Sequence, residues 1–231
     1  MKTYITLRND DPRSVSNQDL YKTNFTVSLP ETLYFESGSK VSLIAAEIPY
    51  TCYNINSNNN QIILSGTTYT VSEGNYSLKQ FLDSVNLLLD KKVSFKVDEK
   101  TLKTTISILS NYNLSGSLLP LFGFEQSFTG RGDHTSSKPV NILSVSSFTV
   151  SIDIAKRSHY YTSKKDTVIG IIPINEATFG DIVQYEAKNY NNYSLSMNTF
   201  KNVKVNIRDQ NLNDIDLNSM PISITLCIES C

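Results

Sequence analysis

Few residues in this 231-residue chain have the types and spacing that catalysis or metal binding needs. The two histidines, His134 and His159, each lack a second histidine or a cysteine at the spacing of a metal-binding pair. The three cysteines, Cys52, Cys227 and Cys231, match no zinc or redox pattern. We therefore expect no metal site and no cofactor, and we interpret Cys52 and Cys227 as ordinary thiols.

Carboxylates occur in pairs that acid–base chemistry could use, namely Asp10-Asp11, Asp98-Glu99 and Asp214 with Asp216. Each pair lies among turn-forming residues, and Asp readily serves turns. The sequence contains no G-x-S-x-G elbow, phosphate-binding loop or dinucleotide fingerprint. The pattern favours solvated turn residues and predicts that the protein is not an enzyme, with acid–base chemistry on a sandwich scaffold as the alternative.

One short motif has a known recognition meaning, Arg131-Gly132-Asp133. It lies in a Gly-, Ser- and Thr-rich stretch within residues 127–139, which we expect to be a loop. Arg and Asp flanking a glycine can present opposite charges at a fixed separation to an integrin-type receptor. Gly132 can equally serve only a turn. The motif is therefore a candidate receptor-binding loop, with a purely structural turn as the alternative.

The elements that must position these residues are mostly strands, because apolar residues alternate with polar ones along much of the chain. Alternation of this kind places one face of an antiparallel strand on a core and the other in water. The alternating segments are 25–29, 93–97, 104–108, 148–154, 203–207 and 222–228. Residues 41–48 and 168–172 are more continuously apolar, which indicates central strands buried on both sides or strands at a subunit contact.

One amphipathic helix is predicted over about residues 77–89. Ser77 is a candidate N-cap, and Gln80 three residues later is its capping-box partner. Apolar residues then follow at helical spacing: Leu78, Phe81, Leu82, Val85 and Leu89. A second, short helical turn is expected near residues 117–121.

Composition and charge exclude several classes of protein. The net charge is −1, so nothing favours general binding to nucleic acid. No apolar run reaches the ~18 residues of a membrane span. The first residues lack the apolar core of a signal peptide, and we expect synthesis in a reducing compartment.

These observations predict an all-β protein, a single jelly-roll sandwich of two antiparallel sheets over residues 1–231. Residues 1–22 could form an extended N-terminal arm. An immunoglobulin-like sandwich is disfavoured because the chain has no Trp and no plausible cysteine pair across strands.

Four segments, taken in order, resemble the penton base and minor capsid proteins of the polinton (Maverick), virophage and adenovirus-like lineage. Two lie before residue 90: the strand KVSLIAAEIPY at 40–50, and Val71–Leu89, where a Val-x-x-Gly-x-Tyr-Ser entry leads into the helix. Leu121–Phe124 with Ser137–Ile142 resembles the family's "LGF … S-x-P-V-N-L" element. Val203–Ile228 is similar to its closing hairpin, except that Ser219 stands where the family has Gly, which leaves the turn type in question.

The resemblance implies a structural capsid protein that forms homopentamers at the fivefold vertices of an icosahedral capsid. Its implied partners are copies of itself, a double-jelly-roll major capsid protein, and a fibre or host receptor. The implied location is the virion, after assembly inside the host cell. The chain is short for a penton protein with a large insertion domain, so a compact version is implied. A receptor- or glycan-binding jelly-roll module, such as a spike head, is the alternative function.

Overall fold

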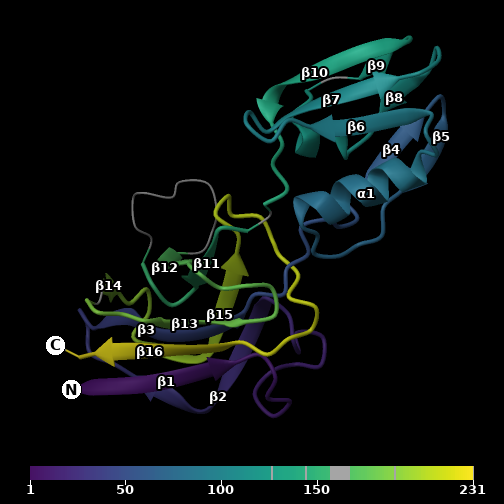
Figure 1. Ribbon diagram of the computed structural model, residues 1–231. Helices are drawn as coiled ribbons and strands as arrows, with labels where there is room; N and C mark the ends of the chain where they lie inside the picture. Colours follow the sequence, from purple (N-terminus) through teal and green to yellow (C-terminus); the bar gives the residue numbers. More distant parts are fainter. Residues whose placement is uncertain (126, 144, 157–166, 190, 231) are drawn as a thin grey trace. The chain divides into compact units, whose positions relative to one another are not determined.

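The chain divides into two compact units (Figure 1). The computed structural model describes residues 1–125, 127–143, 145–156, 167–189 and 191–230. Unit 1 contains Met1–Cys52 and Val145–Cys231, and unit 2 is the intervening Tyr53–Ser144. Each unit encloses its own cluster of buried apolar side chains. The sequence carries no mark of this division, because apolar alternation runs through both units and no linker composition lies at the boundary.

Unit 1 is a sandwich of two antiparallel sheets. Sheet A has the order β1-β16-β3-β13, with the short β14 also paired to β3, and sheet B has the order β12-β11-β15-β2. The strands are β1 (Lys2–Arg8), β2 (Asn24–Tyr34), β3 (Lys40–Pro49), β11 (Ser147–Ile152), β12 (Thr167–Pro173), β13 (Ile182–Glu186), β14 (Tyr193–Ser194), β15 (Thr199–Arg208) and β16 (Ser223–Glu229). The first strand, β1, pairs with the last strand, β16, and β2 pairs with β15. This nesting is the jelly-roll arrangement, so the predicted fold class is confirmed for unit 1.

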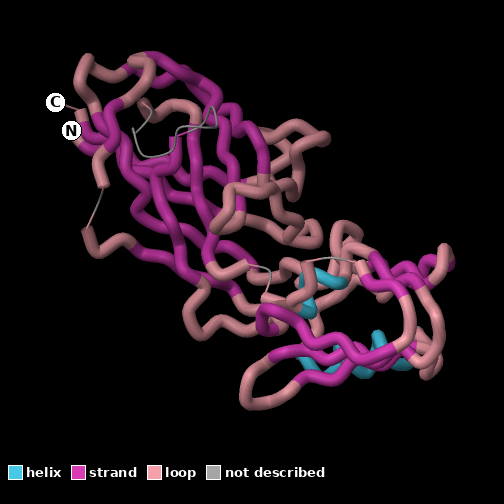
Figure 2. The backbone as a smooth tube through the Cα atoms, turned by 90° about the horizontal axis from the view of Figure 1, so that it is seen from above, coloured by secondary structure: helices cyan, strands magenta, loops and turns pink. Residues whose placement is uncertain are grey.

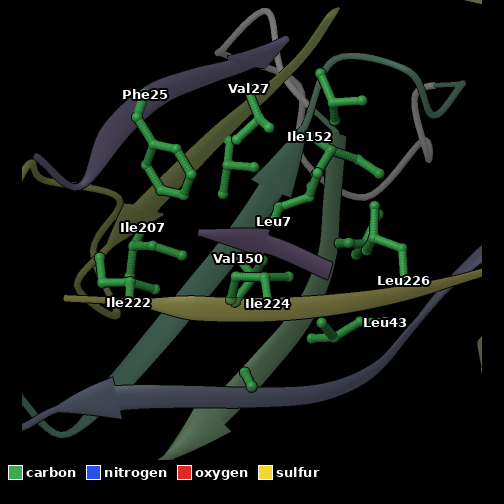
Figure 3. Packing of buried hydrophobic residues seen from close by; sticks show 14 of the residues in the cluster. Leu7, Phe25, Val27, Leu43, Val150, Ile152, Ile207, Ile222, Ile224 and Leu226 are labelled. Carbon is green, nitrogen blue, oxygen red and sulfur yellow. The ribbon is translucent and has the colours of Figure 1, made fainter. Parts of the chain in front are cut away.

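The core of unit 1 is built by alternate side chains from both sheets. Phe25 and Val27 of β2 are buried, whereas Ser28 between Val27 and Leu29 is exposed. Ile224 and Leu226 of β16 face them from sheet A, and Figure 3 shows these side chains filling the space between the sheets. Full burial of one such side chain contributes roughly 1.5–3 kcal/mol. The period-two pattern of the sequence therefore determines which face of each strand turns inward.

Two expectations about individual strands of unit 1 need correction. Residues 2–8 of the expected N-terminal arm form β1, which pairs with β16 along its whole length because Ile5 and Leu7 supply buried side chains to the core. Of the two continuously apolar segments, β3 is central in sheet A, as predicted, but β12 is an edge strand. Ile171 of β12 is 50% exposed, so the interpretation of residues 168–172 as a central strand was wrong. The alternative, a strand at a subunit contact, stays open.

Unit 2 has two small sheets, an α-helix and a 3₁₀ turn. The sheets have the orders β10-β7-β6 and β5-β4-β8-β9. The elements are β4 (Gln61–Leu64), β5 (Thr67–Thr70), α1 (Leu78–Leu88), β6 (Val93–Val97), β7 (Lys103–Ile108), β8 (Asn113–Ser115), η1 (Leu119–Phe122), β9 (Phe128–Thr129) and β10 (Gly132–Pro139). Among the described residues, both helical elements belong to unit 2 (Figure 2).

The helix begins where the sequence predicted. The Ser77 side chain accepts a hydrogen bond from the Gln80 backbone N–H at 3.3 Å, and the Gln80 side chain accepts one from the Ser77 backbone N–H at 2.9 Å. This reciprocal pair satisfies two donors that the first turn of a helix leaves free. Phe81 and Val85 are fully buried, so the apolar face of α1 packs into the core of unit 2.

The insertion of unit 2 and its last two strands were not predicted. A compact chain without a large insertion was implied, whereas Tyr53–Ser144 forms a separate unit between β3 and β11. Residues 127–139 were predicted to be a loop, but most of them form β9 and β10. These strands contain mainly Gly, Ser, Thr and Lys, and only Ser136 of β10 is buried, so they lack the apolar alternation that reveals a strand.

The turn at Leu217–Met220 shows which turn type forms with Ser219 in place of the family's Gly. Asn218 and Ser219 have φ values of 53° and 59°, and the Met220 N–H donates to the Leu217 carbonyl at 3.2 Å. Two successive residues in the left-handed region are typical of a type I′ turn, a turn type in which glycine is preferred. The departure from the family pattern thus leaves a left-handed turn in place.

Gly123, at the end of η1, is a position where a side chain should destabilise unit 2. Its φ is +80°, and an added Cβ would collide with the Lys138 carbonyl of β10. We expect Gly123→Ala to lower the free energy of unfolding by about 2–4 kcal/mol, because left-handed strain adds to a forced backbone shift. Urea unfolding followed by circular dichroism measures the change.

Gly66 provides the matched control. Its φ is +86°, but an added Cβ there would have no atom within 4 Å. Gly66→Ala should therefore cost only the backbone strain, about 1 kcal/mol. Equal losses in the two variants would show that the close approach of β10 to Gly123 is not a constraint on the fold.

Candidate functional site

The described residues bring no nucleophile, acid and base together. Cys52 and Cys227 are buried free thiols, and burial raises the pKa of Cys52 to about 12, so this thiol stays protonated at neutral pH. The His134 ring lies 4.7 Å from the Phe128 ring on a neighbouring part of unit 2. His159 and Cys231 lie outside the described residues. Within the described ranges, no group of three His, Cys, Asp or Glu residues could hold a metal ion.

The carboxylate pairs singled out in the sequence hold turns and ion pairs. Asp10 accepts two hydrogen bonds from the Arg8 guanidinium, at 2.9 and 2.8 Å, which lowers the pKa of that carboxyl group. The Asp98 carboxylate accepts bonds from the backbone N–H groups of Lys100 and Thr101, and these bonds lower its pKa. Asp214 forms an ion pair with Arg208 at 3.1 Å. Their interpretation as turn residues therefore matches the observed contacts.

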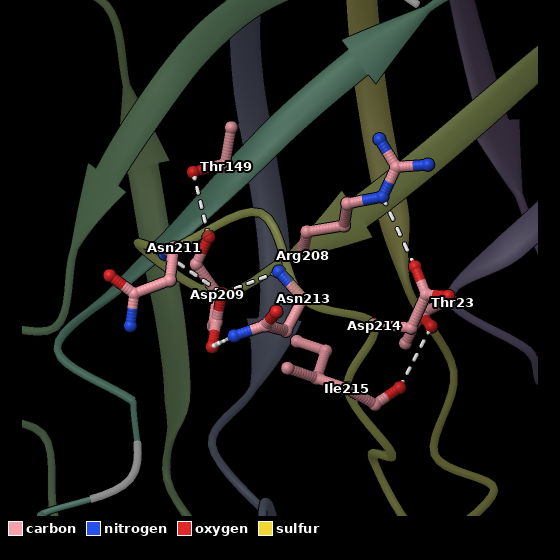
Figure 4. Close-up of polar contacts among 8 residues, drawn as sticks. All are labelled: Thr23, Thr149, Arg208, Asp209, Asn211, Asn213, Asp214 and Ile215. Atoms are coloured by element: carbon pink, nitrogen blue, oxygen red, sulfur yellow. Dashed lines mark hydrogen bonds and ion pairs between the residues drawn. The ribbon is translucent and has the colours of Figure 1, made fainter. Parts of the chain in front are cut away.

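A polar network surrounds Asp209, after β15 (Figure 4). Its carboxylate accepts hydrogen bonds from the backbone N–H of Asn211 at 2.8 Å and that of Asn213 at 2.7 Å, and from the Asn213 side-chain amide at 3.0 Å. The Thr149 hydroxyl donates to the Asp209 carbonyl at 3.2 Å. Asp, Asn and Asn at alternate positions also occur in calcium loops, but here both carboxylate oxygens of Asp209 accept N–H bonds. The arrangement holds the loop rather than presenting oxygens to a cation.

The Arg131-Gly132-Asp133 motif lies at the start of a strand, not in a loop. Gly132 and Asp133 are the first residues of β10 and pair with Ile108 and Ser107 of β7. The residues Arg131 and Asp133 are exposed, and Gly132 has a φ of 143°. The motif is therefore accessible from solvent, and Gly132 provides a backbone conformation that other residues rarely adopt.

A groove of about 560 Å³ lies along the edge strands β12 and β13 of unit 1. Ile172, Pro173, Ile182 and Val183 are among its lining residues. Ile182 is 56% exposed, and with Ile171 it adds apolar surface to two edges beside which the described residues place no strand. The sequence analysis missed β13, although Ile182-Val183-Gln184-Tyr185-Glu186 carries a short alternation that could have revealed it. Exposed edges with apolar side chains are typical of surfaces that contact other chains.

A second hollow, of about 380 Å³, lies between residues 20–24 and 214–219 of unit 1. The Thr23 hydroxyl donates to the Ile215 carbonyl at 2.9 Å across it, so both walls belong to one hydrogen-bonded region. Asp214 and Asp216, one of the carboxylate pairs noted in the sequence, both line this second hollow, where Asp214 pairs with Arg208 and Asp216 accepts a bond from the Asn218 backbone N–H. The edges of the sandwich are the more distinctive surface.

Asp209 should contribute substantially to the stability of unit 1. Asp209→Ala removes the acceptor of three N–H bonds in a position that is only 8% exposed. We expect a loss of about 2 kcal/mol in the free energy of unfolding, because hydrogen bonds to a charged group contribute roughly 1.5–3 kcal/mol. Chemical unfolding of the variant measures this loss.

Asp216→Ala is the comparison for this prediction. The exposed Asp216 carboxylate accepts a bond from the Asn218 backbone N–H at 2.8 Å. Its loss should cost at most about 1 kcal/mol. A smaller effect at Asp209 than at Asp216 would contradict the structural role assigned to the network.

Comparison with known proteins identifies a solved structure with a similar fold. No family model matches the chain, and no curated protein sequence matches it. A solved structure that is similar is the selenomethionine-labelled penton protein of mavirus, with a TM-score of 0.52 and 8% sequence identity. The match covers 100% of this chain and 100% of the mavirus chain. The likeness at this identity concerns the fold, and it confirms that the chain has the penton-like architecture that the sequence resemblance implied.

Proposed function

We propose that the protein is a structural capsid protein that forms pentamers at the fivefold vertices of an icosahedral virion. The observation that carries this proposal is the likeness to the mavirus penton protein over the full length of both chains. The ordered sequence segments that resemble the penton lineage also support it.

The physical character of the surface is consistent with assembly. Among the described residues, β1 and β13 are the outer strands of sheet A and β2 and β12 those of sheet B, and Val15 bridges Val27 on the outer side of β2. Free edges gain hydrogen bonds when another chain covers them. A fivefold ring needs heterologous contacts, in which one surface of each copy meets a different surface of the next. In this proposal the further partner is a double-jelly-roll major capsid protein, and the role is structural rather than enzymatic. Among the described residues, no helix is long and apolar enough to cross a membrane.

Native mass spectrometry of the purified chain tests the proposal. We expect a species of five times the 25.9 kDa chain mass, in equilibrium with monomer at low concentration. Labelling of intact virus particles should locate the protein at the vertices. A chain that stays monomeric at every concentration and is absent from particles would overturn the proposal.

A second candidate function is receptor binding through Arg131-Gly132-Asp133. It is favoured by the exposure of both charged residues of the motif. This function is compatible with a vertex protein, whose outer surface faces the host cell. It requires the two side chains to remain accessible after assembly.

Asp133→Glu tests the receptor candidate, because it keeps the charge but lengthens the side chain by one methylene. Binding of a purified integrin that recognises this tripeptide should fall at least tenfold, measured by surface plasmon resonance. Asp83→Glu, the same change at an exposed position on α1, is the control and should leave binding unchanged. Undiminished binding by the Asp133 variant would reject the receptor function.

A further inference from the structure

The two outer strands of sheet A each have one unpaired edge. Within the part of the chain that the structure describes, β1 pairs with β16 alone and β13 with β3 alone, so they are the two ends of the strand order β1-β16-β3-β13 (Figure 1). Such edges present backbone N–H and C=O groups that can template pairing with another chain. The question is which residues each edge presents.

The hydrogen bonds that flank β13 identify its free groups. The Tyr50 N–H donates to the Asp181 carbonyl at 2.8 Å, and the Ala187 N–H donates to the Ile44 carbonyl at 2.9 Å. Hydrogen-bonded positions alternate along an antiparallel pair, so the odd-numbered residues of β13 bond to β3. The backbone groups that face the free edge belong to Ile182, Gln184 and Glu186, and their side chains are exposed.

The strand β1 shows the same alternation of bonded and free backbone groups. The Asn9 N–H donates to the Ile222 carbonyl at 3.4 Å, and the Ser230 N–H donates to the Met1 carbonyl at 2.9 Å. The odd-numbered residues of β1 therefore bond to β16. The backbone groups at its free edge belong to Lys2, Tyr4, Thr6 and Arg8, whose side chains are exposed.

The two edges differ in charge in a complementary way. From Thr167 to Ala187 the chain has three carboxylates, those of Glu176, Asp181 and Glu186, and no Lys or Arg, and Lys188 follows directly. The strand β1 has the cations Lys2 and Arg8 near its two ends and no carboxylate of its own, and Arg8 is paired with Asp10 just beyond the strand, so Lys2 is the cation available at the edge. Lys2 contacts Glu229 at 3.8 Å, but both side chains are nearly half exposed, and such a pair is weak enough to be shared or replaced.

Strand direction and pleat also agree. Four antiparallel strands place β1 and β13 in opposite directions within one copy. A second copy added in the same orientation therefore brings its β1 antiparallel to the first copy's β13. The free-edge residues of both strands have side chains on the outer face of the sheet, so opposed residues share a face, as an antiparallel pair requires.

We propose that β13 of one copy pairs antiparallel with β1 of a second copy, so that sheet A continues from protomer to protomer. The register places Glu186 opposite Lys2, Gln184 opposite Tyr4 and Ile182 opposite Thr6. It joins the two charged ends and covers Tyr4 and Ile182, which are 62% and 56% exposed in the single chain. The two edges are different surfaces, so the contact is heterologous, and the inference rests on the proposed function for closure into a ring of five.

Charge reversal with rescue tests the pairing. Glu186→Lys and Lys2→Glu should each raise the concentration for half-assembly at least tenfold, because each places like charges opposite one another. The combined Glu186→Lys, Lys2→Glu variant should assemble within about threefold of the unchanged protein, since the opposite charges face each other again. Glu176→Lys, on the connection between β12 and β13, is the control outside the register and should have a smaller effect.

Hydrogen exchange on the unchanged protein gives a second measurement that needs no variant to fold. In the assembled protein the amides of Gln184, Glu186, Tyr4 and Thr6 should exchange at least tenfold more slowly than in the dilute monomer. Amides of the same strands that already bond within the sheet, such as those of Val183 and Ile5, should change less.

The outcomes separate this pairing from the proposed function. A pentamer that both single reversals leave intact, with unchanged exchange at these amides, would overturn the pairing and leave the vertex role standing. An assembly of another number that responds to both reversals and to their combination would support the pairing and overturn the pentamer. A strict monomer at all concentrations would overturn both.

Discussion

Burial of alternate side chains between two sheets is the interaction on which unit 1 depends. The buried side chains come from strands that are far apart in the chain, for example Phe25 and Val27 from β2 and Ile224 and Leu226 from β16. This core therefore forms only when the first and last strands are paired in their places. Every strand must then keep its register, because a slip of one residue would turn its apolar face to water. The edges of both sheets, and the residues that they present, follow from that register.

The sequence was most informative where a pattern reports directly on packing. Apolar alternation identified β2, β11, β15 and β16, and the capping box located the start of α1, because each pattern reflects a local physical need. It failed for β10, whose stability comes from pairing with β7 and not from burial of its own side chains. It also failed to locate the boundary of unit 2, since two cores separated by ordinary strands leave no compositional mark.

The candidate surfaces were the least predictable part. A continuously apolar run such as Val168–Ile172 has the same sequence pattern whether its neighbouring strands belong to its own sheet or to another molecule. Only the strand order shows that β12 is an edge, and only the backbone hydrogen bonds show which residues of β13 face outward. Position within a sheet depends on contacts between distant segments, and no local spacing encodes it. The tripeptide at residues 131–133 was visible at once in the sequence, but its place at the start of a paired strand was not.

The separate core of unit 2 has a consequence for how such a protein can change over time. Tyr53–Ser144 buries its own apolar cluster. Substitutions there therefore mainly change the stability of unit 2 and have little effect on that of unit 1. Selection can therefore act on the inserted segment, including its exposed tripeptide, at a different pace from the strands that build the sheets. The inserted unit can in this way diversify while the sandwich that carries it stays the same.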